Sequence, residues 1–304
     1  DADEELAKAF PQIDWIIGAH SSSFTYAPKE IGKTKLVQVL SKNHYLGEVS
    51  FAHRESKEAD TFSLLEIHDQ LASQLRPNPV ATFLAEHKQR LKQVQLQEEA
   101  EQTVTTYKEK RPGHDHCLSC HGPQYAKWQT TAHSLAYATL LQKNEETNPQ
   151  CVGCHTWGYK KNQGAENTQD FLQFSSENSH LTKEKYLTDV RKIFSVSPTP
   201  SIRKLSPKQR GIYAKKWQAL DQKQQVAINH LNVQCLSCHE QATDHPFEMD
   251  EKKSLTQAAR KAQIVEKCLG CHQPEQAPEW YKQKKVNSAM LEKNYHSIAC
   301  PAMK

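Results

Sequence analysis

The nine residues from His114 to Gly122 read HDHCLSCHG and place a histidine directly after two cysteines that are three positions apart. The unit Cys-x-x-Cys-His occurs four times in this chain of 304 residues, and it uses every cysteine except Cys300. We number these units motifs 1 to 4 in chain order. They are Cys117-Cys120-His121, Cys151-Cys154-His155, Cys235-Cys238-His239 and Cys268-Cys271-His272.

The repeated unit indicates covalent attachment of c-type haem. Each cysteine forms a thioether with the haem, and the histidine that directly follows reaches the iron from one side. Paired cysteines also occur in structural zinc sites and in redox disulfides, but neither requires a histidine after every pair. With 16 histidines in the chain, four such placements by chance have a probability on the order of 10^-5. We therefore expect four covalently bound c-type haems.

The composition agrees with a cofactor-rich protein. Only 37% of the residues are apolar, which is lean for a chain long enough for about two domains, and four haems would add the missing apolar surface. The sequence has no apolar run of about 20 residues, so we expect no membrane span. The formal charge of +4 is small, and ionised haem propionates would offset it, which argues against nucleic acid as a partner.

The expected haems also indicate the compartment in which the protein acts. Covalent haem attachment normally takes place outside the cytoplasmic membrane, so we expect a periplasmic or cell-surface (extracellular) protein. No signal peptide is present at the start, so we expect a processed form in which Asp1 is not the first residue of the gene product. In an oxidising compartment Cys300 is either a free or intermolecular thiol, or a tail cysteine without a role.

Three parts follow one another along the chain. Residues 1–75 predict a small α/β segment, with strands in IDWIIGAH (13–20), TKLVQVL (34–40), YLGEVSF (45–51) and TFSLLEI (61–67). Residues 76–112 predict a linker helix over about 79–109. Residues 113–304 predict a mostly α, loop-rich haem domain, with helices over 181–194 and from Ser206, as N-cap before Pro207, to about Leu231.

The haem domain has a pattern of internal duplication. CLSCH at 117 is followed by CVGCH at 151, and CLSCH at 235 is followed by CLGCH at 268, so the spacing is nearly the same in both pairs. Two copies of a two-haem module explain this spacing and the similar residues inside the motifs. A restricted choice of residues inside the motif is the alternative.

The remaining histidines are the candidates for the second axial ligands. Histidines far outnumber the three methionines, so ligation by histidine on both sides is expected for most haems, and Met/His ligation, which raises the potential, is the minority option. His114, His116 and His180 are weaker candidates, the first two because they lie so close to Cys117. The strongest candidates are His133, His230, His245 and His296.

Residues 117–159, CLSCHGPQYAKWQTTAHSLAYATLLQKNEETNPQCVGCHTWGY, resemble the tetrahaem cytochromes of nitrifying bacteria that accept electrons from hydroxylamine oxidoreductase. Shared features are a Tyr and a Trp after the first motif, then Thr-x-His-x-x-Ala, then Gly-Tyr after the second motif. HLNVQCLSCH (230–239) and CLGCHQPEQAPEWY (268–281) fit the third and fourth motifs, so the resemblance covers roughly residues 113–298.

This resemblance implies stacked haem pairs, and it implies that His133 is a distal ligand, because the family histidine lies 12 residues past its proximal one. One haem of the family is five-coordinate, which leaves the coordination of the haem on His155 open. After motif 3, CHEQATDHPF lacks the usual Gly-Pro, which leaves the place of His245 open.

The N-terminal part resembles something else. IDWIIGAHSSS (13–23) and IGKTKLVQVLSKNHYLGEVSF (31–51) resemble the end of a metallophosphoesterase domain of the 5'-nucleotidase type. In that family a Gly-His-x-His segment supplies two metal ligands. His20 matches the first, but Ser22 occupies the second position, and the earlier ligand motifs would lie upstream of Asp1. A dinuclear hydrolase needs both metals. We therefore expect a remnant or fragment used for packing or contacts, and no phosphoesterase activity.

Three functions are compatible with these observations. Electron transfer between redox partner proteins needs only haems with two axial ligands and an exposed haem edge, and it is the preferred interpretation, with no catalytic side chains. Self-association into a haem chain is a variant of it. The alternative is a multihaem reductase of small nitrogen or sulfur oxyanions, which needs an open iron position. A bifunctional phosphoesterase–cytochrome is the third.

Overall fold

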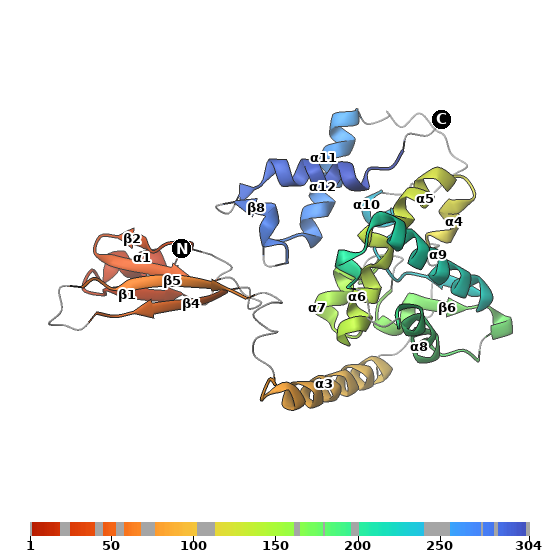
Figure 1. Ribbon diagram of the computed structural model, residues 1–304, viewed down its shortest axis with the longest axis horizontal. Coiled ribbons are helices and arrows are strands. Elements are labelled where there is room, and N and C mark those ends of the chain that lie inside the picture. The colour runs from red at the N-terminus through yellow and green to blue at the C-terminus, as the bar shows by residue number, and fades with distance from the viewer. Residues whose placement is uncertain are drawn as a thin grey trace. The chain divides into compact units, whose positions relative to one another are not determined.

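The structure is a computed structural model. It describes residues 2–18, 25–39, 45–52, 58–67, 77–101, 113–160, 165–178, 180–195, 201–239, 256–274, 276–282 and 285–301, and this part of the chain is mostly helical and loop-rich. Two compact units are present (Figure 1). Unit 1 comprises Asp1–Val80 and Leu269–Glu292, and unit 2 comprises Ala81–Cys268 and Lys293–Lys304.

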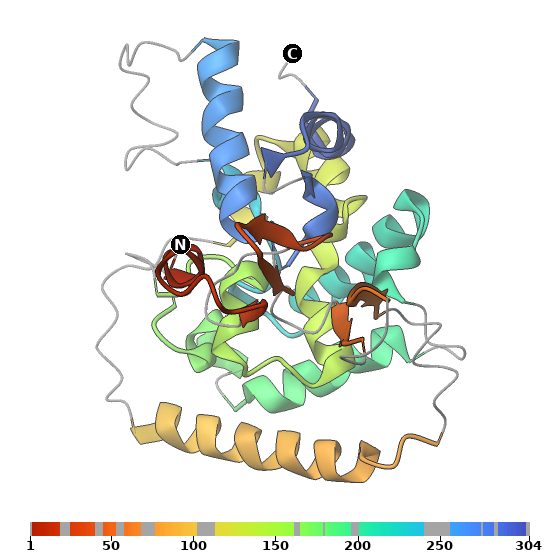
Figure 2. The same cartoon turned by 90° about the vertical axis from the view of Figure 1, so that its left-hand side faces the viewer.

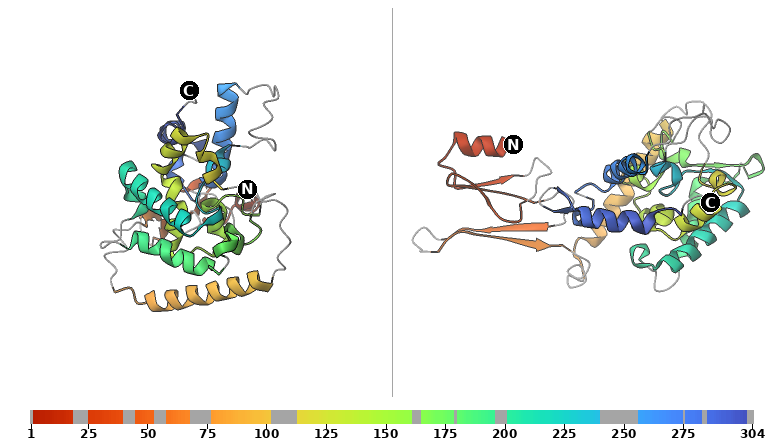
Figure 3. Two further views of the ribbon diagram at one scale, coloured as in Figure 1. Left: turned by 90° about the vertical axis from the view of Figure 1, so that its right-hand side faces the viewer. Right: turned by 90° about the horizontal axis from the view of Figure 1, so that it is seen from above.

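The first part of unit 1 is a small α/β arrangement. Its sheet has the order β1–β3–β2, with β1 parallel and β2 antiparallel to β3, and helix α1 packs Ala7 against Ile16 and Leu36. An antiparallel hairpin, β4–β5, is drawn in orange in the right-hand view of Figure 3. The elements are α1 (Ala2–Ala9), β1 (Trp15–Gly18), β2 (Lys29–Ile31), β3 (Thr34–Gln38), β4 (Tyr45–Ser50) and β5 (Thr61–Glu66).

The four strands expected from alternating and β-branched residues correspond to β1, β3, β4 and β5, so these predictions are confirmed. Strand β2 was not expected; it is short and pairs with β3 across a turn that contains Gly32 at a φ of 62°. His20 and Ser22, the positions compared with metal ligands, lie outside the described residues.

Unit 2 contains the main hydrophobic core of the described chain. Its fully buried members include Leu135, Tyr137, Phe171, Tyr186 and Leu231. The elements are α3 (Ala81–Glu101), α4 (Asp115–Leu118), α5 (Gly122–Gln129), η1 (Ala132–Leu135), α6 (Ala136–Lys143), α7 (Pro149–His155), η2 (Thr168–Phe171), β6 (Leu172–Phe174), η3 (Ser176–Asn178), α8 (Lys183–Phe194), η4 (Ile202–Lys204), α9 (Pro207–Lys223), β7 (Val226–Asn229) and α10 (Cys235–Cys238).

Helix α9 begins as expected but ends earlier than expected. Ser206 caps it reciprocally with Gln209, and Pro207 occupies its first turn. The prediction of helix up to Leu231 is wrong, because Gln225 adopts a left-handed φ of 50° and the next residues form strand β7. Strand β7 pairs antiparallel with β6. The helix expected over 181–194 is confirmed as α8.

Helix α3 matches the described part of the expected linker helix, and Figure 2 shows its whole length. Its polar side is joined to the loop between α6 and α7, with Lys88 Nζ 2.6 Å from Glu145 Oε1 and Lys92 Nζ 2.5 Å from Glu146 Oε1. Four apolar side chains of α3 are exposed; they are Phe83, Leu84, Leu91 and Val94.

The C-terminal residues are shared between the units. Helices α11 and α12 cross the division, and a two-stranded β8–β9 ribbon lies between them in the sequence. The elements are α11 (Gln257–Cys271), η5 (Pro278–Trp280), β8 (Tyr281–Lys282), β9 (Lys285–Val286) and α12 (Ser288–Ile298). Among the described residues, no helix combines the length and the apolar character that crossing a bilayer requires.

Candidate functional site

Each motif lies on a helical segment or at its end. Motif 1 begins at the third residue of α4 and continues past its end, and the two cysteines of motif 3 are the first and last residues of α10. Motifs 2 and 4 lie at the C-terminal ends of the longer helices α7 and α11. In motif 1 the backbone N–H of His121 donates to Cys117 O at 2.8 Å, and in motif 3 His239 donates to Cys235 O at 2.9 Å. Residues three and four positions apart share a helix face, so the side chains of each motif emerge together.

None of the nine cysteines is joined in a disulfide. A c-type haem requires two thiols and a histidine nitrogen on one side of a short helical segment, and each motif provides this set. The residues present therefore fit the group.

Motifs 1 and 3 lie next to each other within unit 2. The thiols of Cys117 and Cys235 are neighbours, and the Cys235 thiol lowers the pKa of Cys117 to about 7. The segments around them are also joined: Trp128 Nε1 donates to Val233 O at 2.8 Å, and the backbone N–H of His114 donates to Gln234 Oε1 at 3.0 Å. The first cysteines of these two motifs are therefore neighbours, although 118 positions separate them in the sequence.

Close approach of these two segments requires a glycine. A Cβ at Gly113 would lie 2.6 Å from Asn229 O, which is closer than carbon and oxygen can approach. Cys238 of motif 3 lies near the thiols of Cys268 and Cys300, and burial, together with these two neighbours, raises its pKa to about 11. Motif 3 is thus close to both motif 1 and the first cysteine of motif 4.

The histidine of motif 2 is held in a defined tautomer. His155 Nδ1 lies 2.7 Å from the carbonyl oxygen of Ala136, and a carbonyl oxygen only accepts, so Nδ1 carries the proton. In the neutral ring Nε2 then has the free lone pair that an iron ligand needs. Burial lowers the pKa of His155, which favours this neutral form.

The histidine of motif 4 packs on an aromatic ring within unit 1. The rings of His272 and Trp280 are stacked, with centroids 4.1 Å apart and planes at 10°. Tyr281 Oη also donates to His272 O at 2.8 Å. Trp280 is itself buried, so it limits the orientations open to the His272 ring.

The structure brings two of the four expected distal histidines to one segment. His230 is fully buried, and the Trp157 ring lies edge-on to it at 4.7 Å. His133 is half-buried on η1, and its carbonyl oxygen accepts from Val233 N at 3.2 Å. His133 and His230 therefore both lie at the segment that leads into motif 3.

The other two expected distal histidines are not brought there by the described contacts. His296 is exposed on α12, with its ring 5.7 Å from Tyr295. His245 lies outside the described residues. His116 and His180, the weaker candidates with His114, are both exposed.

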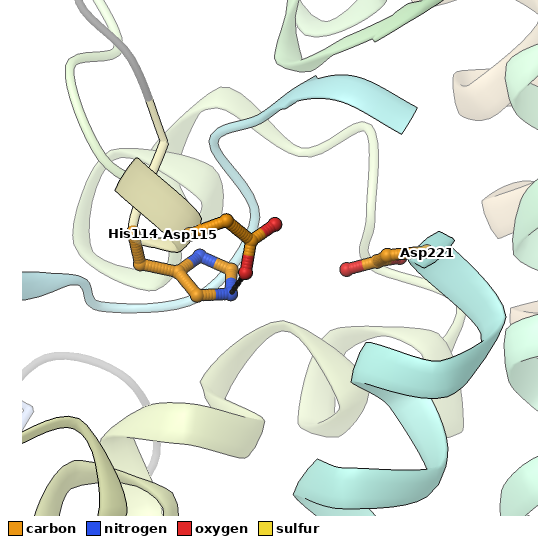
Figure 4. Close-up of side chains that lie close together, drawn as sticks. All are labelled: His114, Asp115 and Asp221. Carbon is orange, nitrogen blue, oxygen red and sulfur yellow. Dashed lines mark ion pairs between the residues drawn. The ribbon is translucent and has the colours of Figure 1, made fainter. Parts of the chain in front are cut away.

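Sequence reasoning missed a buried cluster around His114 (Figure 4). One nitrogen of His114 and one oxygen each of Asp115 and Asp221 lie within 4.8 Å of one another. His114 was assessed only as a weak haem ligand, and it is buried between Tyr125 and Trp128, with ring centroids at 5.7 and 4.7 Å. Asp221 has no motif around it, so only the fold reveals that it lies here.

Comparison with known proteins gives one match. The family model described as cytochrome c554 and c-prime matches residues 116–180, which contain motifs 1 and 2. No curated protein and no solved structure matches the chain. Cytochromes of this kind carry covalently bound c-type haem, are typically exported, and transfer electrons. The match supports a cytochrome c family for this chain.

Proposed function

We propose that the chain binds four c-type haems, one at each motif, and carries electrons between redox partner proteins. The observation that carries the proposal is that all four motifs place two cysteines, neither of them in a disulfide, and a histidine on a helical segment or at its end. Motifs 3 and 4 lie beyond the matched residues, but motif 3 is placed at a four-residue helix as motif 1 is, and motif 4 ends a longer helix as motif 2 does.

The proposed ligand set follows from the histidines. His121, His155, His239 and His272 are the proximal ligands, and His133, His230, His245 and His296 complete most of the irons. When bound, the haems supply the centres that accept and release single electrons. The protein holds the histidine rings, as Ala136 O does for His155, and excludes water around His230.

The haems of motifs 1 and 3 form a stacked pair in this proposal. The contact between Cys117 and Cys235 and the hydrogen bonds between their flanking segments support it. Close haems pass electrons without any catalytic side chain. The proposed place of action is the periplasm or the cell surface, and self-association into a haem chain would extend the same path between molecules.

For residues 1–75 we propose a partial metallophosphoesterase-like segment that serves in packing or contacts. A parallel pair of strands, β1 and β3, supports an α/β origin. Phosphoesterase activity is not part of the proposal, because Ser22 stands where the family has a second histidine ligand.

Haem counting tests the proposal. The purified protein should contain four haems by pyridine haemochrome assay, and replacing both cysteines of any one motif with alanine should remove one. Cys300→Ala is the matched control and should retain all four. A content of two haems, with zinc bound at the remaining cysteines, would refute the proposal.

Electron paramagnetic resonance distinguishes an electron carrier from a reductase. Entirely low-spin ferric iron means that every haem has two strong axial ligands. A high-spin signal that amounts to one haem per chain would instead favour the reductase of small nitrogen or sulfur oxyanions, and His133→Ala and His230→Ala would then show which irons these residues complete.

A further inference from the structure

The cluster around His114 contains a carboxyl group for which burial is costly. Asp221 is buried on α9, and no lysine or arginine in the described part of the chain pairs with it. Its two oxygens accept hydrogen bonds from Tyr186 Oη and, at 2.9 Å, from Asn229 Nδ2. Burial raises the pKa of Asp221 to about 7, although these two hydrogen bonds act to lower it.

A path for protons leads from this carboxyl group toward the surface. His114 is buried, and its Nε2 lies 3.3 Å from Oδ1 of Asp115, whose side chain is 41% exposed. Since the His114 and Asp221 atoms lie within 4.8 Å, one water molecule can bridge them. A cavity of about 10 Å³, lined by His114, Asp221 and Asn232 among others, has room for a single water.

The cluster is joined to both motif 1 and motif 3. The backbone N–H of Cys117 donates to His114 O at 3.0 Å. On the other side, Asn229, which holds Asp221, accepts a hydrogen bond from Gln234 Nε2 at 2.6 Å, and Gln234 directly precedes Cys235. A change of charge at these motifs would therefore act on Asp221 through a buried region, where screening by solvent is weak.

The cluster does not have the character of a metal site. Tyr186 and Asn229 already occupy both oxygens of Asp221, and the Tyr125 hydroxyl donates to Asp115 Oδ1 at 3.2 Å. Hydrogen bonds thus hold Asp115 at the surface end and Asp221 at the buried end, and the distance of up to 4.8 Å between the His114 and Asp221 atoms is one that a single water would bridge.

We infer that Asp221 is a buried proton-binding site that takes up one proton when an electron enters the haem pair of motifs 1 and 3. This inference rests on the proposed electron-transfer function. A donor protein supplies the electron, which reduces one ferric iron to ferrous, and bulk water supplies the proton, which passes Asp115 and His114 to an Asp221 carboxylate oxygen. On oxidation both leave again.

Electrostatics determines the direction in which proton uptake at Asp221 and the haem reduction potential affect each other. The added electron disfavours a carboxylate nearby, so reduction raises the proton affinity of Asp221, and the reduction potential falls as the pH rises through the region near 7. The titratable groups that face Asp221 from the packed elements are Tyr186 of α8, Tyr125 of α5, and His114 and Asp115 of the segment at the start of α4.

Redox titration of the haem-loaded full chain between about pH 5.5 and 8.5 tests the inference. A tenfold change in proton activity shifts a one-electron couple by at most ~59 mV. The wild type should approach this slope near pH 7 for one haem of the pair, and Asp221→Asn should lose it. Asp189→Asn, the same change at a partly exposed carboxylate of α8 that is paired with Lys192, is the matched control and should behave as the wild type.

A second variant and a second readout keep the test decisive if Asp221→Asn fails to fold. Tyr186→Phe removes a hydrogen bond that stabilises the carboxylate, so the sloping region should move to higher pH. Infrared difference spectra of the wild type should also gain a protonated carboxyl band on reduction, and Tyr186→Phe should shift that band.

Potentials independent of pH in the wild type, or a full slope kept in Asp221→Asn, would overturn the inference, and the haem propionates would account for the second result. Both outcomes leave the proposed function intact, because the haems still titrate. Absence of any haem redox signal would refute the proposed function itself.

Discussion

The central part of the chain, residues 113–239, and the C-terminal part, residues 256–301, both carry Cys-x-x-Cys-His motifs but differ in how they bury side chains. The central part has a core that includes Leu135, Phe171 and Tyr186. In the C-terminal part only Ala277 and Trp280 are buried among the described side chains. Helix α12 has no buried residue at all among those described.

This difference indicates that the two parts would depend on haem for apolar contacts to different extents. The central part can fold on its own side chains, and the haems would add to an existing core. The C-terminal part has no such core among its described residues, so we expect its helices to depend on the proposed haem of motif 4 for apolar contact.

Loss of the haem of motif 4 should give the largest effect. In Cys268→Ala/Cys271→Ala, we expect residues 256–301 to lose amide protection, while residues 136–231 keep theirs, because the latter have their own core. Hydrogen–deuterium exchange read by mass spectrometry measures both. The control is Cys151→Ala/Cys154→Ala, which should leave 256–301 protected; equal loss in both variants would break the comparison.

Truncation of a buried side chain in the central part should give the second largest effect. Phe171 is fully buried between the rings of Tyr137 and Tyr159, so Phe171→Ala should lower the free energy of unfolding by ~3–5 kcal/mol. Ile212→Ala on α9 is the control, because that side chain is 48% exposed, and it should change stability by at most ~0.5 kcal/mol. Chemical denaturation of the haem-loaded protein measures both. Equal losses of unfolding free energy in the two variants would mean that the buried Phe171 side chain stabilises the fold no more than an exposed side chain does.

A buried glutamate in the loop between α6 and α7 joins α3 to α8. Glu146 is 2% exposed, and its Oε1 contacts Lys92 Nζ and Arg191 Nη2, both at 2.5 Å. Both cations remain partly exposed, so Glu146→Gln should cost ~1–3 kcal/mol of unfolding free energy. The exposed pair of Lys192 and Asp189 is the control, and Lys192→Gln should cost less than ~1 kcal/mol.

The pH dependence of this effect has a definite sign. Burial alone would raise the pKa of Glu146, but the hydrogen bond from Lys92 and the charge of Arg191 lower it more, so the net pKa is below 4.5. A group with a lowered pKa in the folded state stabilises the protein above its unfolded pKa. Its contribution is therefore lost as the pH falls below about 4.5, and thermal unfolding of Glu146→Gln should lack that part of the acid sensitivity.

The sequence predicted what local patterns determine. Ser206 with Pro207 predicts the start of α9, because a serine cap and a proline in the first turn are local signals. The end of α9 was missed, because Gln225 carries no glycine-like signal for its left-handed φ. The strand β7 depends on pairing with β6, more than 50 positions earlier, which no local window contains.

The candidate site shows the same limit. His230 was expected as a ligand from its place before motif 3, and the fold adds that it is fully buried. Nothing in the sequence near Asp221 indicates that it meets His114, because this encounter depends on α9 packing beside the segment before motif 1. Buried charged groups on different elements are found only when the packing is known.

Removal of the ring that stacks on His272 should give the smallest effect and refines the comparison. Trp280 is one of the two buried side chains of the C-terminal part, and Trp280→Leu keeps an apolar side chain while losing the stack at 4.1 Å. An aromatic pair contributes ~0.5–1.5 kcal/mol beyond its buried area, so thermal unfolding should show a loss of that size.

The loss should be confined to the C-terminal part if that part depends on its haem. Amide exchange should rise over residues 256–301 and stay unchanged over 136–231, and the potential of one haem should shift as the His272 ring gains freedom. Trp157→Leu, at the ring that meets His230 edge-on, is the matched change in the central part, where the surrounding core should limit the spread of exchange. Equal spread in both variants would mean that the two parts are held by the same kind of packing.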